Sequence, residues 1–292
     1  MDAKHPVEID EFTGVATTGH EWDGIKELNN PLPRWWLWTF YASIAFATVY
    51  VVLYPAIPLV RGATPGLLGW HSREAVSQDL AALDATRGGE MEKLAATPLA
   101  AIESDPKLLS FARDAGRAAF ADDCAPCHGA GGQGSIGYPN LNANRWLWGG
   151  KVDQIYATIE HGARSGDPKG HQGLMPAFGR DGILDDAKIS HVADYVRSLA
   201  GFPAAKGADV ADGLKVFQAN CVVCHGADGK GNVQVGSANL TTKVWLYGPT
   251  KEDIVKGVWG GHGGVMPYWS GRLSEPTIRA LAVYVHTLGG GQ

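Results

Sequence analysis

The longest hydrophobic stretch of the chain runs from Trp35 to Tyr54, where twenty consecutive residues carry no charge. Twenty residues in a helix span about 30 Å, which is the thickness of the hydrocarbon core of a bilayer. Tryptophan and tyrosine residues gather at both ends of the stretch, as they do at membrane–water interfaces. We therefore predict one transmembrane helix, within residues 35–60.

A cleaved signal peptide and a buried core helix are the other interpretations of this stretch. A signal peptide has a short basic segment before its apolar region. Here 34 residues precede the stretch, and they include Glu8, Asp10 and Glu21. A helix at the edge of a soluble core would have a polar face, whereas this stretch is apolar on all sides. Both patterns favour a membrane anchor.

Apolar residues recur at helical spacing in two later places, which predicts two amphipathic helices. One set is Val192, Tyr195, Val196 and Leu199, and the other is Ile278, Leu281, Val285 and Leu288. These helices close two copies of an internal repeat. Residues 116–128 match residues 213–225 at an offset of 97, and later landmarks follow in the same order at offsets of 99, 91 and 89.

Each repeat predicts a helix that leads into a cysteine motif, a glycine-rich loop, a short helix, a methionine loop and the closing helix. We place the two resulting domains at 106–203 and 206–292, after a linker at 61–105 that contains helical pieces. Gly116 and Gly213 lie within the first helices, where glycine costs about 1 kcal/mol relative to alanine. We expect the closing helix to pack closely against their backbone.

The chain has four cysteines, in two Cys-x-x-Cys pairs that are each followed by histidine: Cys124, Cys127 and His128, then Cys221, Cys224 and His225. A cysteine pair alone fits a disulfide, a zinc site or a redox motif. The adjoining histidine indicates attachment of haem c, with two thioethers to the cysteines and the imidazole as an axial iron ligand. Structural zinc would need four ligands. We predict two covalently attached haem c groups.

Met175 and Met266 are the predicted sixth iron ligands. They occupy equivalent Met-Pro positions in glycine-flanked loops, whereas Met1 is the initiator and Met91 lies in the linker. Histidine–methionine ligation raises the haem potential and saturates the iron, which suits electron transfer. By default each methionine serves the haem of its own repeat. Exchange of the two loops between the repeats is the alternative.

Three histidines are rival ligands, and we interpret them as surface residues or residues near the haem propionates: His161, His171 and His262. They have no counterparts in register, except that His161 and His262 both lie beside a glycine before the methionine loop. Four aromatic residues are interpreted as walls of the haem pockets or core: Trp146, Trp148, Trp245 and Tyr247.

The composition narrows the class of protein further. With 45% hydrophobic residues, the 292-residue chain is mainly soluble apart from its anchor, and a net charge of −5 gives no reason to expect nucleic-acid binding. Haem c motifs of this kind imply attachment on the outer side of a bacterial inner membrane. We therefore expect a single-pass protein with residues 1–34 in the cytoplasm and the haem domains in the periplasm.

Residues 20–36, the single anchor and the tandem Cys-x-x-Cys-His repeats resemble the dihaem subunit III, of the CcoP or FixP type, of cbb3-type cytochrome c oxidase. The resemblance extends over nearly the whole chain. It implies a mainly α fold, with one N-terminal transmembrane helix followed by two tandem class I cytochrome c-like domains.

The resemblance also implies a function and partners. Electrons would come from a donor c-type cytochrome and pass, through the monohaem cytochrome c subunit II, to the catalytic haem-copper subunit I. Oxygen is reduced to water and protons are pumped there, so the chain itself would contain no catalytic site.

Three other functions remain open from the sequence. The chain could be a dihaem electron-transfer subunit of another membrane dehydrogenase, which shares the same motifs. A dihaem peroxidase needs one haem with an open ligand position, whereas each haem here has a predicted methionine. A redox sensor would need an output module, and the sequence contains no recognisable one.

Overall fold

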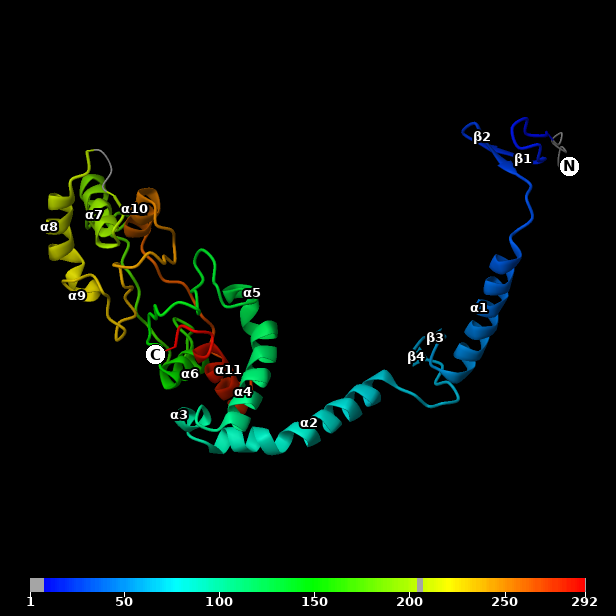
Figure 1. Cartoon of the computed structure of the whole chain (residues 1–292), viewed down its shortest axis with the longest axis horizontal. Helices are drawn as coiled ribbons and strands as arrows, with labels where there is room; N and C mark the ends of the chain where they lie inside the picture. Colours follow the sequence, from blue (N-terminus) through cyan, green and yellow to red (C-terminus); the bar gives the residue numbers. More distant parts are fainter. Residues whose placement is uncertain (1–7, 204–206, 292) are drawn as a thin grey trace. The chain divides into compact units, whose positions relative to one another are not determined.

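The computed structural model describes residues 8–203 and 207–291, and the chain divides into two compact units, residues 1–84 and 85–292. Residues 1–7 of the predicted cytoplasmic segment and residues 206 and 292 of the second predicted domain lie outside the described residues. Helices predominate in the described part, and its strands form two small hairpins (Figure 1). The prediction of a mainly α protein is confirmed.

A β-hairpin precedes the membrane anchor. Strand β1 (Thr17–Trp22) pairs antiparallel with β2 (Ile25–Leu28). The chain turns at Asp23 and Gly24, whose φ values of 50° and 84° are the left-handed values that a tight two-residue hairpin turn requires. This hairpin was not among the elements predicted from the sequence. The Asp-Gly pair between apolar residues was the signal that could have revealed it.

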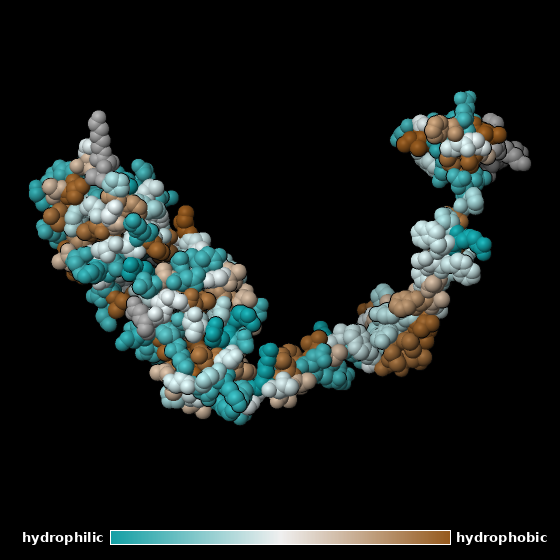
Figure 2. Space-filling view, in the orientation of Figure 1, coloured by the Kyte–Doolittle hydropathy of each residue, from teal (hydrophilic) through white to brown (hydrophobic). Residues whose placement is uncertain are grey.

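Helix α1 (Arg34–Leu53) has the length and composition of a membrane-spanning helix, and none of its residues is buried within the chain. Brown, hydrophobic residues gather in Figure 2 around the C-terminal end of α1, whereas the start of the helix is paler. Apolar side chains that point in every direction would be covered by lipid tails rather than by protein. The helix therefore fits the predicted anchor in length and in surface.

The helix is shorter than the segment 35–60 that the sequence assigned to the anchor, and it ends at Leu53. The helix stops before Tyr54, whose φ of −118° and ψ of 159° are extended. Pro55 is the reason, because a proline disfavours helical conformation in the residue before it and has no N–H to continue the helix. The chain beyond it forms a second hairpin, of β3 (Pro58–Leu59) and β4 (Gly62–Ala63).

The remaining elements are helices. The predicted linker contains α2 (Ser72–Ala96) and α3 (Leu99–Ile102). The first repeat contains α4 (Pro106–Ala119), the π-helical turn η1 (Phe120–Cys124), α5 (Ala125–His128), α6 (Val152–His161) and α7 (Asp186–Leu199). The second repeat contains α8 (Val210–Asn220), α9 (Val222–His225), α10 (Lys251–Gly260) and α11 (Glu275–His286).

The closing helices of the two repeats are exchanged. Helix α11, which ends the second repeat, packs on α4 and α6 of the first (Figure 1). Helix α7, which ends the first repeat, packs on α8 and α10 of the second. Each hydrophobic core therefore combines segments of both predicted domains. The boundaries 106–203 and 206–292 stay a prediction, and the cores do not follow them.

Glycine permits these close helix contacts. A Cβ on Gly116 would overlap the carbonyl oxygen of Ala280 in α11, and a Cβ on Gly213 would overlap the carbonyl oxygen of His191 in α7. The expected packing of a closing helix against these two glycines is confirmed. In both cases the helix comes from the other repeat.

Candidate haem-binding sites

The two cysteine motifs lie on short helices of the same design. In the first repeat Cys124 ends the turn η1, and α5 carries the motif on to His128. In the second repeat Cys221 caps α9, which ends at His225. Both helices stop at a glycine with positive φ, so the histidine forms the last residue of its helix. None of the four cysteines forms a disulfide within the described residues.

Burial raises the pKa of the first cysteine thiol in each motif. Desolvation raises the pKa of the Cys124 thiol to about 12, with the neighbouring Asp123 adding to the effect, and raises the pKa of Cys221 to about 11. A thiolate is therefore disfavoured at both positions. A thioether carries no charge, so attachment of an apolar macrocycle at these sulfurs involves no buried anion. The environment fits haem attachment better than a thiolate zinc site.

The two motif histidines make matching hydrogen bonds. His128 Nδ1 lies 3.0 Å from the carbonyl oxygen of Pro139, and His225 Nδ1 lies 2.9 Å from that of Ala238. A carbonyl can only accept, so Nδ1 carries the proton and Nε2 keeps a lone pair for a metal. Burial lowers the pKa of both imidazoles, which favours the neutral form that ligates iron.

The predicted methionine ligands lie against the core of the other repeat. Met266 packs against the core cluster that contains Phe120, and Cys124 packs against the same cluster. Met175 packs against the core cluster that contains Phe217, and Cys221 packs against the same cluster. The default pairing placed Met175 with the first motif. The packing instead favours the exchanged pairing, which the sequence analysis kept as its alternative.

Backbone hydrogen bonds hold each methionine loop in this exchanged position. The Met266 amide donates to the carbonyl of Ala163 at 2.9 Å, and the Ala163 amide donates back at 3.0 Å. The Met175 amide donates to the carbonyl of His262 at 2.8 Å, and the His262 amide donates back at 3.1 Å. Each loop is thus paired with the residues that follow the short helix of the other repeat.

Two of the rival histidines have equivalent surroundings. The ring of His171 stacks on Trp148 with centroids 4.1 Å apart, and that of His262 stacks on Tyr247 at 3.7 Å. Both histidines lie four residues before a methionine ligand, so they are in register. This register was not predicted, because His262 was compared with His161, which also lies beside a glycine.

The third rival, His161, lies between two carboxylates. Its Nδ1 is 2.9 Å from an Asp167 oxygen, and its Nε2 is 3.2 Å from a Glu160 oxygen. Both ring nitrogens are therefore engaged with protein groups. These contacts direct both ring nitrogens of His161 towards carboxylates and not towards a cysteine motif.

The buried indole N–H of Trp245 in the second core indicates whether a haem would fit there. Trp245 packs against the cluster with Cys221 and Met175, and its buried Nε1 has no hydrogen-bond partner among the described residues. The equivalent Trp146 donates its Nε1 hydrogen to the carbonyl of Gly290. A buried indole N–H normally has an acceptor. A haem propionate would supply one, so the residues present fit the group.

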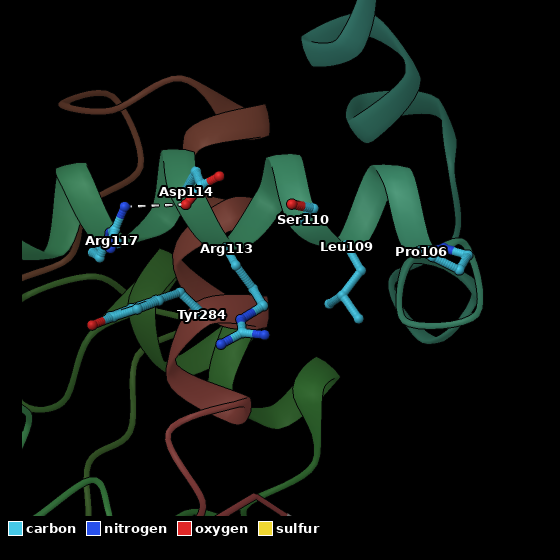
Figure 3. Close-up of a pocket in the computed structure, with 7 residues that line it drawn as sticks. All are labelled: Pro106, Leu109, Ser110, Arg113, Asp114, Arg117 and Tyr284. Carbon is cyan, nitrogen blue, oxygen red and sulfur yellow. Dashed lines mark hydrogen bonds and ion pairs between the residues drawn. The ribbon is translucent and has the colours of Figure 1, made fainter.

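A surface pocket lies along α4 (Figure 3). Its lining residues are Pro106, Leu109, Ser110, Arg113, Asp114, Arg117 and Tyr284. Arg117 and Asp114 pair across one turn of the helix at 3.2 Å. The pocket contains none of the predicted cysteine, histidine or methionine ligands, and it is not the haem site.

Models of known families match three parts of the chain. Residues 14–61 match the N-terminal domain of cytochrome oxidase-cbb3, FixP. Residues 114–200 match cytochrome c, and residues 208–285 match cytochrome C oxidase, cbb3-type, subunit III. The first match covers the hairpin and anchor, and the other two cover one cysteine motif each.

Curated relatives match over nearly their whole length. The cbb3-type cytochrome c oxidase subunit FixP of Azorhizobium caulinodans is 58% identical over 288 residues, which cover 99% of this chain and 98% of the relative. FixP of Bradyrhizobium diazoefficiens is 54% identical over 285 residues, 98% of each chain. CcoP of Cereibacter sphaeroides is 47% identical over 277 residues, 94% of this chain and 95% of the relative.

Proposed function

This chain belongs to the family of cbb3-type cytochrome c oxidase subunits FixP and CcoP, and we propose that it carries electrons from a donor c-type cytochrome to the catalytic subunit of the oxidase. It is an electron-transfer subunit with two covalently bound haem c groups. The reduction of oxygen belongs to another chain of the complex. The alternatives of a dehydrogenase subunit or a peroxidase are not supported by the relatives.

The observation that carries the proposal is the matched pair of imidazoles. Each Cys-x-x-Cys-His helix holds its histidine by a hydrogen bond from Nδ1 to a backbone carbonyl, so that Nε2 is free to bind iron. A methionine lies against the same core in both cases. When bound, the haem groups supply one-electron iron chemistry, and histidine–methionine ligation leaves no position for oxygen.

We assign the haem-binding residues in exchanged pairs. Cys124 and Cys127 attach the first haem, with His128 and Met266 as axial ligands. Cys221 and Cys224 attach the second haem, with His225 and Met175 as axial ligands. The backbone pairing of each methionine loop with the other repeat supports this assignment.

Helix α1 anchors the subunit in a membrane. We place that membrane as the bacterial inner membrane, with residues 1–34 in the cytoplasm and both haem domains in the periplasm, because haem c is attached on that side. The hairpin and anchor match the FixP-specific model rather than a general cytochrome c model. This segment is therefore the part suited to contact the other oxidase subunits, which we propose are the haem-copper subunit I and the monohaem subunit II.

Purification of the tagged full-length chain from membranes in mild detergent tests the proposal. A haem-copper subunit and a monohaem cytochrome should purify with it, and the complex should consume oxygen when supplied with a reduced c-type cytochrome. A pyridine haemochrome assay with mass measurement should give two covalent haem c groups per chain. Recovery of a dehydrogenase instead, or of an isolated chain that turns over peroxide, would contradict the proposal.

A further inference from the structure

A single arginine lies between the two methionine loops. Arg164 follows helix α6, and its Nε donates a hydrogen bond to the carbonyl of Gly264 at 2.6 Å. Its Nη1 donates to the carbonyl of Gly173. Gly173 lies two residues before Met175, and Gly264 lies two residues before Met266. One guanidinium therefore joins equivalent carbonyls of both methionine loops.

Arg164 belongs to a segment that only the first repeat contains. The offset between the repeats is 99 at Gly162 and Gly261 but 91 at the methionine loops, so the first repeat has eight additional residues, 163–170. An arginine between two equivalent loops needs no counterpart. A second guanidinium at the same place would bring two positive charges together. The presence of this segment in only one repeat is therefore consistent with a single arginine that contacts both methionine loops.

The backbone around Arg164 is held firmly. Its amide donates to the carbonyl of His171 at 2.6 Å, and the preceding residue, Ala163, pairs in both directions with Met266. Arg164 has a φ of 52°, a left-handed value that residues other than glycine seldom adopt. Such a conformation persists where the surrounding structure imposes it, and it recurs at functional positions. Here it accompanies a side chain that reaches both loops.

The guanidinium suits this position chemically. It is partly buried, and burial lowers its pKa, although arginine remains charged. It forms no ion pair with a carboxylate of the described residues, and both of its contacts are to carbonyl oxygens. A planar fork can donate to two acceptors at once, whereas the ammonium of lysine is a compact charge at the end of a flexible chain.

We propose that Arg164 is a positioning residue that clamps the two methionine loops to each other, so that both haem irons retain their methionine ligands. This proposal rests on the exchanged ligation assigned above. It implies that the two haem sites share one support: loosening either loop weakens the hold on the other. It also places one positive charge between two sites that exchange electrons.

The test uses the full-length, haem-loaded chain in detergent with Arg164→Gln and Arg164→Lys variants. Arg180→Gln is the matched control, because Arg180 is exposed, lies in the same repeat and, among the described residues, pairs through its side chain only with the adjacent Asp181. The readouts are the iron–methionine charge-transfer band of the ferric protein and the midpoint potential of each haem from spectroelectrochemical titration. Haemochrome assays verify that each variant carries two haems.

Arg164→Gln should reduce the iron–methionine band and lower both midpoint potentials, because ligation by methionine raises the haem potential. Arg164→Lys should also reduce the band, since lysine keeps the charge but not the fork, and Arg180→Gln should match the wild type. A wild-type band and potentials in Arg164→Gln would overturn the proposal. So would a change at only one haem, or full retention of the band in Arg164→Lys.

Failure of the clamp is distinguishable from failure of the ligation assignment. Met175→Ala and Met266→Ala should each abolish the methionine band of one haem. If they do so while Arg164→Gln behaves as wild type, only the clamp is refuted. If neither methionine variant alters the band, the ligation assignment fails, and the clamp fails with it.

Discussion

The ring of Phe120 packs against the ring of Tyr284, with centroids 5.3 Å apart and planes inclined at 56°. Phe120 precedes the first cysteine motif, whereas Tyr284 lies on the last helix of the chain. The equivalent residues of the other core, Phe217 and Tyr195, meet at 5.2 Å and 55°. The same aromatic contact thus forms twice, each time between different repeats. The helix that leads into each haem motif therefore packs against the closing helix of the other repeat.

The exchange predicts which methionine serves which haem. In a chain with Cys221 and Cys224 replaced by alanine, only the first haem remains attached. Adding Met266→Ala should remove the iron–methionine band of that haem and lower its midpoint potential, because the methionine ligand is lost. Adding Met175→Ala should leave the band in place.

The reciprocal chain provides the control. With Cys124 and Cys127 replaced by alanine, Met175→Ala should now be the damaging change and Met266→Ala the tolerated one. The opposite pattern in both chains would establish ligation within each repeat and refute the exchange.

Gly116 should not tolerate a side chain. Alanine there would place its Cβ against the carbonyl of Ala280, so helix α11 must move. Overpacking of this kind costs about 1–3 kcal/mol of unfolding free energy. Denaturant titration of the haem-loaded protein measures the change. Gly88→Ala is the control, because a Cβ at Gly88 in α2 meets nothing, and alanine should there stabilise the helix by up to about 1 kcal/mol. Equal stability in both variants would contradict this account.

A buried ion pair supports the second core. Lys251 Nζ lies 2.7 Å from a carboxylate oxygen of Asp194, whose other oxygen has no hydrogen-bond partner among the described residues. Lys251→Met would leave this buried carboxylate without its cation. Removing one partner of a fully buried pair costs about 3–5 kcal/mol, and we expect about 2 kcal/mol here because Lys251 is partly exposed.

Lys215→Met provides the comparison for that prediction. Lys215 pairs with Asp212 on the surface at 2.6 Å, and exposed pairs contribute about 0–1 kcal/mol. Thermal unfolding of the two variants should rank Lys251→Met as clearly less stable. A smaller effect from Lys251→Met than from Lys215→Met would refute the structural role of the buried pair.

His171 should make stability depend on pH in the acid range. Burial lowers its pKa below the ordinary value of 6.5, with Arg164 and His161 adding to the effect. The unfolded chain therefore binds a proton at His171 more readily than the folded chain, so stability falls as pH decreases below 6.5. In His171→Phe, which keeps an aromatic ring against Trp148, the free energy of unfolding should fall less steeply over that range. An unchanged slope would show that His171 is not responsible.

The anchor and the hairpin before it show which structural features could be predicted from local sequence patterns. The apolar stretch predicted a helix, and the helix is present, but its end at Leu53 depends on Pro55 rather than on hydrophobicity. The preceding hairpin was missed because its strands are short and exposed, so they lack the alternation that marks a half-buried strand. Only its Asp-Gly turn carried a signal.

The haem motifs could be read from sequence because their chemistry is local. Two cysteines and a histidine within five residues share about one turn of helix, wherever that helix packs. The partners that fix the imidazoles, Pro139 and Ala238, could not be read in the same way. They act through backbone carbonyls, which every residue possesses, and only folding brings one of them to Nδ1.

Local sequence patterns were enough to identify two haem-attachment motifs, two methionine loops and one anchor. They could not show how the motifs and loops combine, because the two repeats share the same landmarks in the same order and the sequence is compatible with both pairings. The exchanged arrangement is visible only in contacts between residues far apart in the chain, such as Phe120 with Tyr284 and Ala163 with Met266. The role proposed for Arg164 also depends on the tertiary structure, because its guanidinium can contact both methionine loops only when the fold brings them together.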